Sequence, residues 1–366
     1  MQEIIELTKS LIRFKSMHSR PEEIRACAEF IGNYLSEHGA TWRRLDRDGV
    51  PSILALPKEK EAAVILMSHI DVVDAPDALF EPHVKGSRLY GRGSIDDKYA
   101  AALSMVLFKE HLVRCRKQGG GQGDLSFGIL VTGDEEIGGK KGAKEALAQV
   151  KAEFCIALDG GSLNKIVAKE KGVLRLKLIS KGKTAHGARP WLGENAVEKL
   201  ISDYLKIKPF FELTAPEHWH RTLNFSIIHA GKSVNQVPDY AEALFDIRYT
   251  ESDDVEQLIE DLRKQIQGEL AVESREPLFQ GGDSPFLDLL LSIAKGTTVG
   301  FEHGASDARF LSDYRIKGIV WGADGDLTQH SLEEHLNIES AFALYRILDE
   351  FVALVADSKE VRSNRV

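Results

Sequence analysis

A buried strand that ends in two adjacent glutamates constrains this chain more than any other stretch. Leu125–Val131 (LSFGILV) is short and apolar, and Glu135 and Glu136 follow it within the segment VTGDEEIGG. Two neighbouring carboxylates at a strand end repel each other and lose hydration. The pattern therefore predicts a positive partner such as a metal centre, with one glutamate binding metal and the other moving protons. For an isolated Glu-Glu pair, a solvated acidic turn is the alternative.

Length, charge and cysteine usage limit the class of protein. The 366 residues are enough for two domains, and 43% hydrophobic with 28% charged residues is ordinary for a soluble globular protein. The net charge of −9 argues against a nucleic-acid partner. The N-terminal stretch MQEIIELTKSLIRFKS has the pattern of an amphipathic helix rather than a signal peptide, and no apolar run is long enough to cross a membrane. Together with the widely spaced Cys27, Cys115 and Cys155, which indicate reduced core thiols, this predicts a cytoplasmic protein.

The order of expected strands and helices indicates one domain inserted into another. Strands alternate with helices in the first part, which predicts an α/β catalytic domain with a mixed, largely parallel sheet flanked by helices. After about Lys169 the order becomes β-α-β-β-α-β, a ferredoxin-like α+β unit, and α/β character then returns, with a short helix expected at Ala305–Asp313. We therefore expect a catalytic domain over 1–168 and 283–366 and an inserted lid or dimerisation domain over 169–282.

Two further polar patterns stand next to expected elements. His69 and Asp71 end a strand, and residues two apart face the same side, so Asp71 can orient the ring of His69 for metal binding. The GRG motif at 91–93 resembles part of a phosphate loop, but an acidic Asp96 at the position of the last glycine favours a cation. The alternatives for His69 and Asp71 are a core histidine or a surface turn. The alternative for Asp96 or Asp97 is a plain helix N-cap.

Taken together, these residues form one set of nitrogen and oxygen ligands. Its members are His69, Asp96, Glu136, Asp159 and His330. Four of them follow an expected strand or open a helix at an expected strand end, where open α/β folds form their sites. Imidazole and carboxylate ligands suit Zn²⁺, Co²⁺ or Mn²⁺. The sequence therefore predicts a metal site at one edge of the sheet.

Eight motifs in fixed order resemble those of one enzyme family along nearly the whole chain. They are SHIDVV, GRGSIDDK, TGDEEIGG, ALDGG, KTAHGARPWLGENA, SVNQVPDYAEALFDIR, HGASDARFL and HSLEE. The chain resembles the two-metal amidohydrolases and peptidases that include acetylornithine deacetylase, succinyl-diaminopimelate desuccinylase, aminoacylase and glutamate carboxypeptidase. The resemblance implies a catalytic α/β domain with an inserted lid. It also implies two divalent metal ions, for which Zn²⁺ is the first choice and Co²⁺ or Mn²⁺ are the alternatives.

The resemblance also implies a role for each matching position. Asp96 corresponds to the carboxylate that bridges the two metals. His69 and Asp159 correspond to ligands of one metal, and Glu136 and His330 correspond to ligands of the other. Glu135 corresponds to the general base, and Asp71 corresponds to the carboxylate behind His69. In the insertion, His186 corresponds to a histidine that polarises the scissile carbonyl, and Asn235 and Arg248 to the pair that holds the substrate's carboxylate. A cap of a Gly-rich turn is the alternative for His186, and a pair with Asp246 on the strand face is the alternative for Arg248.

The implied activity is hydrolysis of an amide bond in a small carboxylate-bearing N-acyl amino acid or short peptide. The wording GARPWLGENA is closer to deacylases and desuccinylases than to dipeptidases, which leaves a metallo-dipeptidase or carboxypeptidase as the alternative. A nucleotide-binding protein and an inactive metal-binding partner module are the readings from other classes. Family members with an insertion this small usually dimerise through it, with His186 and Asn235 reaching the partner's metal centre. We therefore expect a homodimer.

Some positions depart from the family pattern. Tyr99 and Ser68 stand where glycine is usual in the family. The family's common Trp…Pro-Phe stretch after the His-x-Asp motif appears here as Phe-Glu-Pro-His at 80–83. These departures concern the walls of the pocket, which leaves the acyl group and the exact substrate open. His18, His38 and His111 match no motif, and we expect them at the surface. His83, His303 and His335 lie near motifs without an expected role.

Overall fold

The computed structural model describes residues 1–357, which divide into two compact units. Unit 1 contains Met1–Lys169, Gln280–Glu302 and the chain from Ser306 onward, and unit 2 contains Glu170–Phe279 with His303–Ala305. The sequence predicts an insertion over 169–282. The chain thus leaves unit 1, builds unit 2 and returns.

A nine-stranded sheet forms the centre of unit 1. The strands follow the order β1-β2-β6-β3-β7-β15-β8-β13, and β14 pairs with β8. Their bounds are β1 Arg43–Arg47, β2 Val50–Ala55, β3 Glu61–His69, β6 Phe127–Thr132, β7 Lys151–Ala157, β8 Lys165–Glu170, β13 Phe279–Gln280, β14 Thr298–Glu302 and β15 Lys317–Val320. The inner strands β6, β3, β7 and β15 are parallel, whereas β1, β2 and β8 pair antiparallel. This arrangement confirms the expected mixed, largely parallel α/β sheet.

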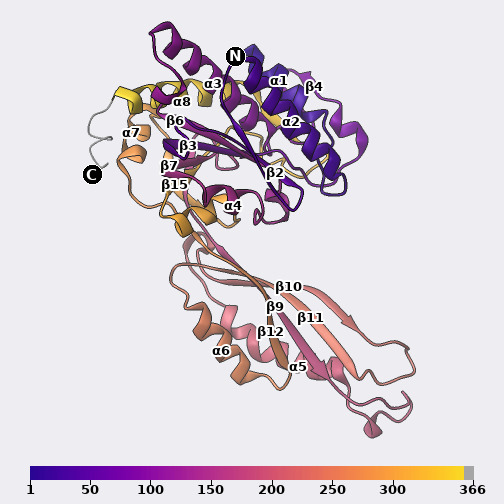
Figure 1. Ribbon diagram of the computed structural model, residues 1–366. Coiled ribbons are helices and arrows are strands. Elements are labelled where there is room, and N and C mark those ends of the chain that lie inside the picture. Colours follow the sequence, from indigo (N-terminus) through magenta and orange to yellow (C-terminus); the bar gives the residue numbers. More distant parts are fainter. Residues whose placement is uncertain (358–366) are drawn as a thin grey trace. The chain divides into compact units, whose positions relative to one another are not determined.

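Helices cover the sheet of unit 1 because its inner strands are apolar on both faces. The main hydrophobic core joins one strand face to α1, α2, α3, α7 and α8 (Figure 1). Their bounds are α1 Gln2–Ile12, α2 Pro21–Glu37, α3 Lys98–Lys117, α7 Pro285–Ile293 and α8 Ile338–Asp357. The short helix α4 (Ala143–Leu147) contacts the 3-10 helix η7 (Asp307–Tyr314), which forms where a short helix over Ala305–Asp313 is expected.

Smaller elements complete unit 1. A three-stranded sheet has the order β16-β5-β4, formed by His335–Asn337, Arg88–Tyr90 and His83–Lys85. Further 3-10 helices are η1 Asp77–Phe80, η2 Gln122–Asp124 and η3 Glu135–Ile137. All three cysteines are free thiols, two of them buried and Cys115 partly exposed. Across residues 1–357, no helix has the length and apolar character that crossing a membrane requires.

Unit 2 is a four-stranded antiparallel sheet covered by two helices. The chain order is β9 Gly172–Lys181, α5 Ala196–Ile207, β10 Thr222–Ala230, β11 Tyr240–Tyr249, α6 Val255–Gln265 and β12 Glu269–Glu276, with short 3-10 helices η4 Pro190–Leu192, η5 Lys208–Phe211 and η6 Pro216–His218 between them. The strands lie in the order β10-β11-β9-β12. Alternate residues of β9 and β11 point into a core shared with α5 and α6, which lie on one side of the sheet (Figure 1).

Candidate metal centre

The carboxyl ends of the four parallel strands gather most of the expected site residues. His69 is the last residue of β3, Glu135 and Glu136 open η3 after β6, and Asp159 lies two residues beyond β7. His330 lies in the loop after β15. Strand ends of a parallel sheet meet at one edge, so residues far apart in the sequence lie close together there.

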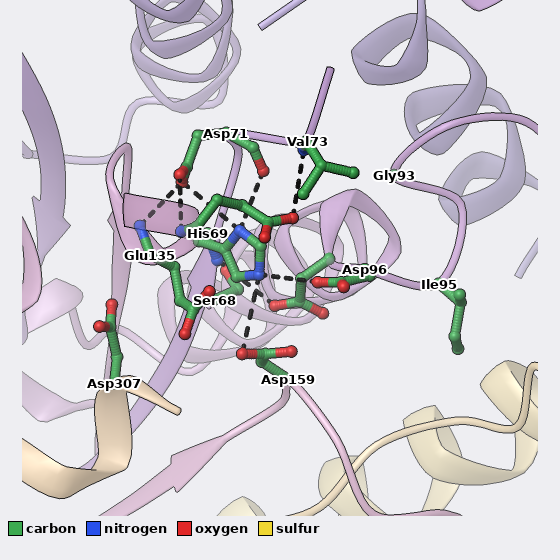
Figure 2. A network of polar contacts seen from close by, with 12 residues as sticks. Ser68, His69, Asp71, Val73, Gly93, Ile95, Asp96, Glu135, Asp159 and Asp307 are labelled. Atoms are coloured by element: carbon green, nitrogen blue, oxygen red, sulfur yellow. Dashed lines mark hydrogen bonds and ion pairs between the residues drawn. The ribbon is translucent and has the colours of Figure 1, made fainter. Parts of the chain in front are cut away.

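Two histidine–carboxylate groups form at this edge and share Asp96. His69, Asp96 and Asp159 form one group, and Asp96, Glu136 and His330 form the other, each with ligand atoms within 4.8 Å of one another. Oδ1 of Asp96 lies 3.0 Å from Nε2 of His69, and its Oδ2 lies 3.1 Å from Nε2 of His330. The two oxygens of Asp96 therefore face different groups, and Figure 2 shows Asp96 beside His69 of the first group.

The remaining ligands complete each group. Oδ2 of Asp159 lies 3.7 Å from Nε2 of His69, and Oε2 of Glu136 lies 3.2 Å from Nε2 of His330. His69 is buried, whereas the His330 side chain is 53% exposed. The structure thus brings together all five residues expected as ligands.

The main chain at Asp71 orients His69. Nδ1 of His69 donates to the carbonyl oxygen of Asp71 at 3.0 Å, which leaves Nε2 free to act as a ligand atom. The Asp71 carboxylate lies farther away, 3.5 Å from Nδ1. It accepts the N–H groups of Glu135 and Glu136 at 3.1 and 3.0 Å and thereby holds the turn that carries both glutamates.

His18 also binds this carboxylate, so the expectation of a surface residue was wrong. Its Nε2 lies 2.8 Å from Oδ2 of Asp71, and 26% of its side chain is exposed. Burial alone raises the pKa of Asp71, but the hydrogen bonds with His18 and His69 outweigh it and lower the pKa to about 2. His111 is likewise mostly buried and bonded to Asp349 at 2.8 Å. His18 lies 53 residues from Asp71 in the sequence, and no local pattern connects the two.

Asp97 does not cap a helix with its side chain. It precedes α3, but its Oδ2 accepts the backbone N–H of His69 at 3.3 Å, and no side-chain bond to the helix is present. The residue is fully buried. Asp97 therefore begins α3 through its main-chain carbonyl, while its side chain binds the main chain at His69.

Glu135 faces a small cavity beside the first group. His69, Asp159 and Asp307 also line this cavity, together with Met67, Ser68 and Ala157. Burial, and then the nearby carboxylates of Asp159 and Asp307, raise the pKa of Glu135 well above its ordinary value. Figure 2 shows Glu135 and Asp307 on the same side of His69. A carboxyl with a raised pKa beside an imidazole is suited to accept and return a proton near neutral pH.

The charges of the two groups fit divalent cations. Burial disfavours the charge of Asp96, but hydrogen bonds with His330 and His69 hold its pKa well below the usual range. Hydrogen bonds with Asp96 and Glu136 raise the pKa of His330 to about 10. The carboxylates thus carry negative charge that the chain balances with protons on histidine. A donor set of imidazole nitrogens and carboxylate oxygens, with one carboxylate shared, suits two borderline divalent ions.

The loop that carries His330 is held by residues that the sequence did not single out. His335, buried, contacts Oδ2 of Asp326 through Nε2 at 3.0 Å, and Arg88 donates to the same oxygen at 2.6 Å. Glu334 and Arg92 are also buried and bond to each other. The motif HSLEE contains Glu334, but its sequence gives no sign of the partner 242 residues away.

Two of the positions that depart from the family pattern, Phe80 and Tyr99, are packed into unit 1. The hydroxyl of Tyr99 donates to the carbonyl of Leu158 at 2.9 Å and accepts the N–H of Ala323 at 2.8 Å. It therefore joins the end of β7 to the segment after β15. Phe80 is buried in a small core with Met17 and Val72.

The three expected residues of the insertion lie in unit 2. His186 and Asn235 are exposed and belong to adjoining loops, since the N–H of Gly187 donates to the carbonyl of Asn235 at 2.6 Å. Arg248 lies on β11 and donates through Nε to Oδ1 of Asp246 at 2.7 Å. This pair matches the alternative considered for Arg248.

Curated proteins with similar sequences carry two kinds of name. The chain is 26% identical to a probable carboxypeptidase of Uncinocarpus reesii, over 92% of this chain and 83% of the relative. It is 27% identical to a succinyl-diaminopimelate desuccinylase of Nitratiruptor sp., over 96% of this chain and 99% of the relative. Both similarities extend over nearly the whole of this chain.

Solved structures share the fold. The aminopeptidase PepT of Bacillus cereus superposes with a TM-score of 0.76 at 17% identity, covering 97% of this chain and 98% of the other. An M20 family metallo-carboxypeptidase of Sulfolobus solfataricus, Sso-CP2, also gives 0.76, at 18% identity and with 98% and 100% coverage. The sequence pattern described as "Peptidase family M20/M25/M40" matches residues 65–354. The chain therefore belongs to peptidase family M20/M25/M40 and is a hydrolase of amide or peptide bonds.

Proposed function

We propose that this protein is a two-metal hydrolase that cleaves the amide bond of a small substrate bearing a carboxylate. The observation that carries the proposal is the position of Asp96, whose two oxygens face two separate histidines. A carboxylate in this position can bridge two cations and offset part of their repulsion. His69 and Asp159 would hold one ion, and Glu136 and His330 the other. Zn²⁺ suits these ligands, as do Co²⁺ and Mn²⁺.

The residues around the two histidine–carboxylate groups would have separate roles in the reaction. When bound, two divalent ions polarise a carbonyl and lower the pKa of a shared water. Glu135 would take a proton from the attacking water on its carboxylate and pass it to the leaving nitrogen. Asp71 would keep Glu135 in place through the N–H bond at 3.1 Å and keep Nδ1 of His69 protonated through its carbonyl.

Residues of unit 2 would bind and polarise the substrate. A guanidinium such as Arg248 can grip a carboxylate through two parallel hydrogen bonds, with Asn235 as a second donor. His186 would donate to the developing oxyanion of the scissile carbonyl. The exposure of His186 and Asn235 supports contact with a substrate or a second chain rather than a role in the core of unit 2.

A homodimer through unit 2 is part of the proposal. Strand β10 lies at one end of the sheet order, and Ile227 and Ile228 on it are 44% and 47% exposed. On α5, Ile201 and Leu205 are 44% and 58% exposed and lie four residues apart, on one side of the helix. An apolar helix side and a sheet edge are surfaces that a two-fold related copy can cover.

A hydrolysis screen tests the activity. The substrates are N-acetyl, N-succinyl and N-carbamoyl amino acids and dipeptides, each offered to protein loaded with Zn²⁺ or with Co²⁺. Cleavage of an acyl amino acid favours a deacylase or desuccinylase, whereas cleavage of dipeptides favours the peptidase alternative suggested by the carboxypeptidase relatives. The Glu135→Gln variant, purified in the same way, controls for contaminating enzymes.

Two outcomes would contradict the proposal. If fully loaded protein cleaves none of the substrates, the reading as an inactive metal-binding module becomes the better one. If hydrolysis continues at an unchanged rate after the ions are removed by a chelator and dialysis, the reaction does not use the two groups.

A further inference from the structure

Glu334 is a buried carboxylate that binds the loop carrying Asp96. Only 1% of the residue is exposed. Its Oε1 accepts the backbone N–H groups of Gly93 at 2.8 Å, Ile95 at 3.3 Å and Asp96 at 3.4 Å. Its own carbonyl accepts the N–H of Gly91 at 3.2 Å. One residue therefore fixes the main chain of the loop that leads to Asp96, of which Figure 2 labels Gly93, Ile95 and Asp96.

Arg92 holds the other side, the loop that carries His330. Its guanidinium is buried and binds Oε2 of Glu334 through Nη1. Nη2 donates to the carbonyl oxygens of His330 at 3.2 Å and Ser331 at 3.3 Å. The planar guanidinium of arginine can donate to a carboxylate and to carbonyl oxygens at the same time. The ammonium group of lysine lacks this geometry. Arg92 and Glu334 thus connect the main chain at Asp96 to the main chain at His330.

His330 depends on such a connection more than His69 does. His69 ends a central strand and is 1% exposed. The His330 side chain is 53% exposed, and its φ of 62° is a conformation that non-glycine residues seldom adopt. A residue in a strained, exposed position needs its surroundings to fix it.

We propose that Arg92 and Glu334 are positioning residues that set the distance between Asp96 and His330 and so control the affinity of the ion position formed by Asp96, Glu136 and His330. The proposal rests on the metal roles proposed above. The ion position of His69, Asp96 and Asp159 is less dependent on this pair, because β3 and the end of β7 fix two of its three ligands.

Two variants and a matched control test this inference. Glu334→Gln keeps the size of the side chain and one acceptor oxygen but removes the charge that Arg92 binds. Arg92→Lys keeps the positive charge but loses the fork to the two carbonyls. The control is Asp203→Asn in unit 2: Asp203 is also buried, accepts the N–H groups of Gln267 and Gly268 at 3.0 and 2.8 Å, and binds Lys206 at 3.0 Å.

Metal binding is measured directly, by equilibrium dialysis against buffered Zn²⁺ and by the visible absorption of Co²⁺ during titration. For both variants we expect the first ion to bind within about threefold of the wild-type affinity and the second ion to bind about 10- to 100-fold more weakly, the usual cost of losing a group that orients a ligand. The control should bind both ions as the wild type does. Circular dichroism and the melting temperature of the ion-free proteins establish that each variant is folded, and Arg92→Lys carries the test if Glu334→Gln does not fold.

The outcomes separate this inference from the proposed function. Wild-type protein that takes up fewer than two ions overturns the proposed function itself. Wild-type uptake of two ions, together with unchanged or equally weakened binding of both ions in a folded variant, overturns only the positioning role of Arg92 and Glu334. A loss of the second ion in Asp203→Asn would also overturn it, since any buried carboxylate would then have the same effect.

Discussion

The candidate residues of the two units differ in how much of their geometry their own unit fixes. In unit 1, His69, Asp96 and Asp71 are buried and bonded to one another or to the main chain. In unit 2, His186 and Asn235 are exposed on loops, and Arg248 pairs with a neighbour on its own strand. Buried polar groups must find partners, whereas exposed ones are satisfied by water until a ligand arrives. The comparison teaches that the candidate residues of unit 1 are held by the fold itself, whereas those of unit 2 depend on a substrate or second chain for the contacts we propose.

The largest effect is expected at the residue that both groups of unit 1 share. Asp96→Ala should lose both ions, because each group contains one of its oxygens, and turnover should be lost with them. Metal content after dialysis against a fixed free Zn²⁺ concentration measures the effect, with the exposed Asp77→Ala as the control. Full occupancy in Asp96→Ala would remove the basis for a shared carboxylate.

Glu135 and Glu136 should separate chemistry from ion binding within unit 1. Glu135→Gln should keep both ions and the fold but reduce kcat by about 10²- to 10⁴-fold or more, because a proton-transfer group is lost. Glu136→Gln should instead weaken one ion position. The measurements are kcat and metal content for each variant. A near-normal kcat in Glu135→Gln would mean that another residue is the base.

Arg248 tests whether unit 2 binds the substrate. Arg248→Ala should raise KM about 10- to 100-fold for substrates with a carboxylate, the usual effect of losing a charged hydrogen bond, and should leave metal content unchanged. Asp246→Ala is the matched control, because it breaks the same ion pair but keeps the guanidinium. If both variants have equal effects, or if the loss is the same for substrates with the carboxylate amidated, Arg248 serves only its strand.

His186 tests whether unit 2 acts across a dimer. Inactive His186→Ala and Glu135→Gln proteins are mixed under conditions that allow subunit exchange. If His186 acts on the partner's site, a mixed dimer has one site with both defects and one with neither, and up to about a quarter of wild-type activity should return with random exchange. No recovery despite demonstrated exchange, or a monomer in solution, would show that His186 does not act across a dimer.

The smallest effect is the release of protons when ions bind to unit 1. Because the pKa of His330 is raised to about 10, this histidine is protonated at pH 7.5 in the ion-free chain and must lose its proton to become a ligand. Binding should therefore release at least one proton per chain, and affinity should rise with pH up to about 10 and then level off. Calorimetry in two buffers with different ionisation enthalpies measures the number. Proton-neutral binding would contradict the charge balance described here.

Much of the fold was predictable, because the spacing of apolar residues indicates which segments form helices and which form strands. The expected buried strand Leu125–Val131 overlaps β6, and the expected order of the insertion is the order from β9 to β12. Strands of two or three residues such as β4, β13 and β16 were not predicted, because so few residues show no periodic pattern. The short helix expected over Ala305–Asp313 forms as the 3-10 helix η7, which begins two residues later and ends one residue later.

The candidate site was predictable only where its residues follow strand ends in recognisable motifs. His69, Asp96, Glu136, Asp159 and His330 belong to this class. The roles of His18 and Glu334, which support these ligands, were not predicted. Their partners, Asp71 and Arg92, lie far away in the sequence. A sequence read from one end to the other gives the ends of strands but not the contacts between distant loops.

Because unit 2 interrupts unit 1 along the chain, the two proposed ion positions would be completed at different times during synthesis. His69, Asp96 and Asp159 all precede unit 2 in the chain, whereas His330 follows it. Domains generally fold in the order in which they leave the ribosome. A chain that stops anywhere between residues 160 and 329 contains every ligand of the first position and an incomplete second one. Occupancy of the second proposed position would therefore report that synthesis has passed unit 2 and that the segments of unit 1 before and after it have joined, whereas occupancy of the first would not.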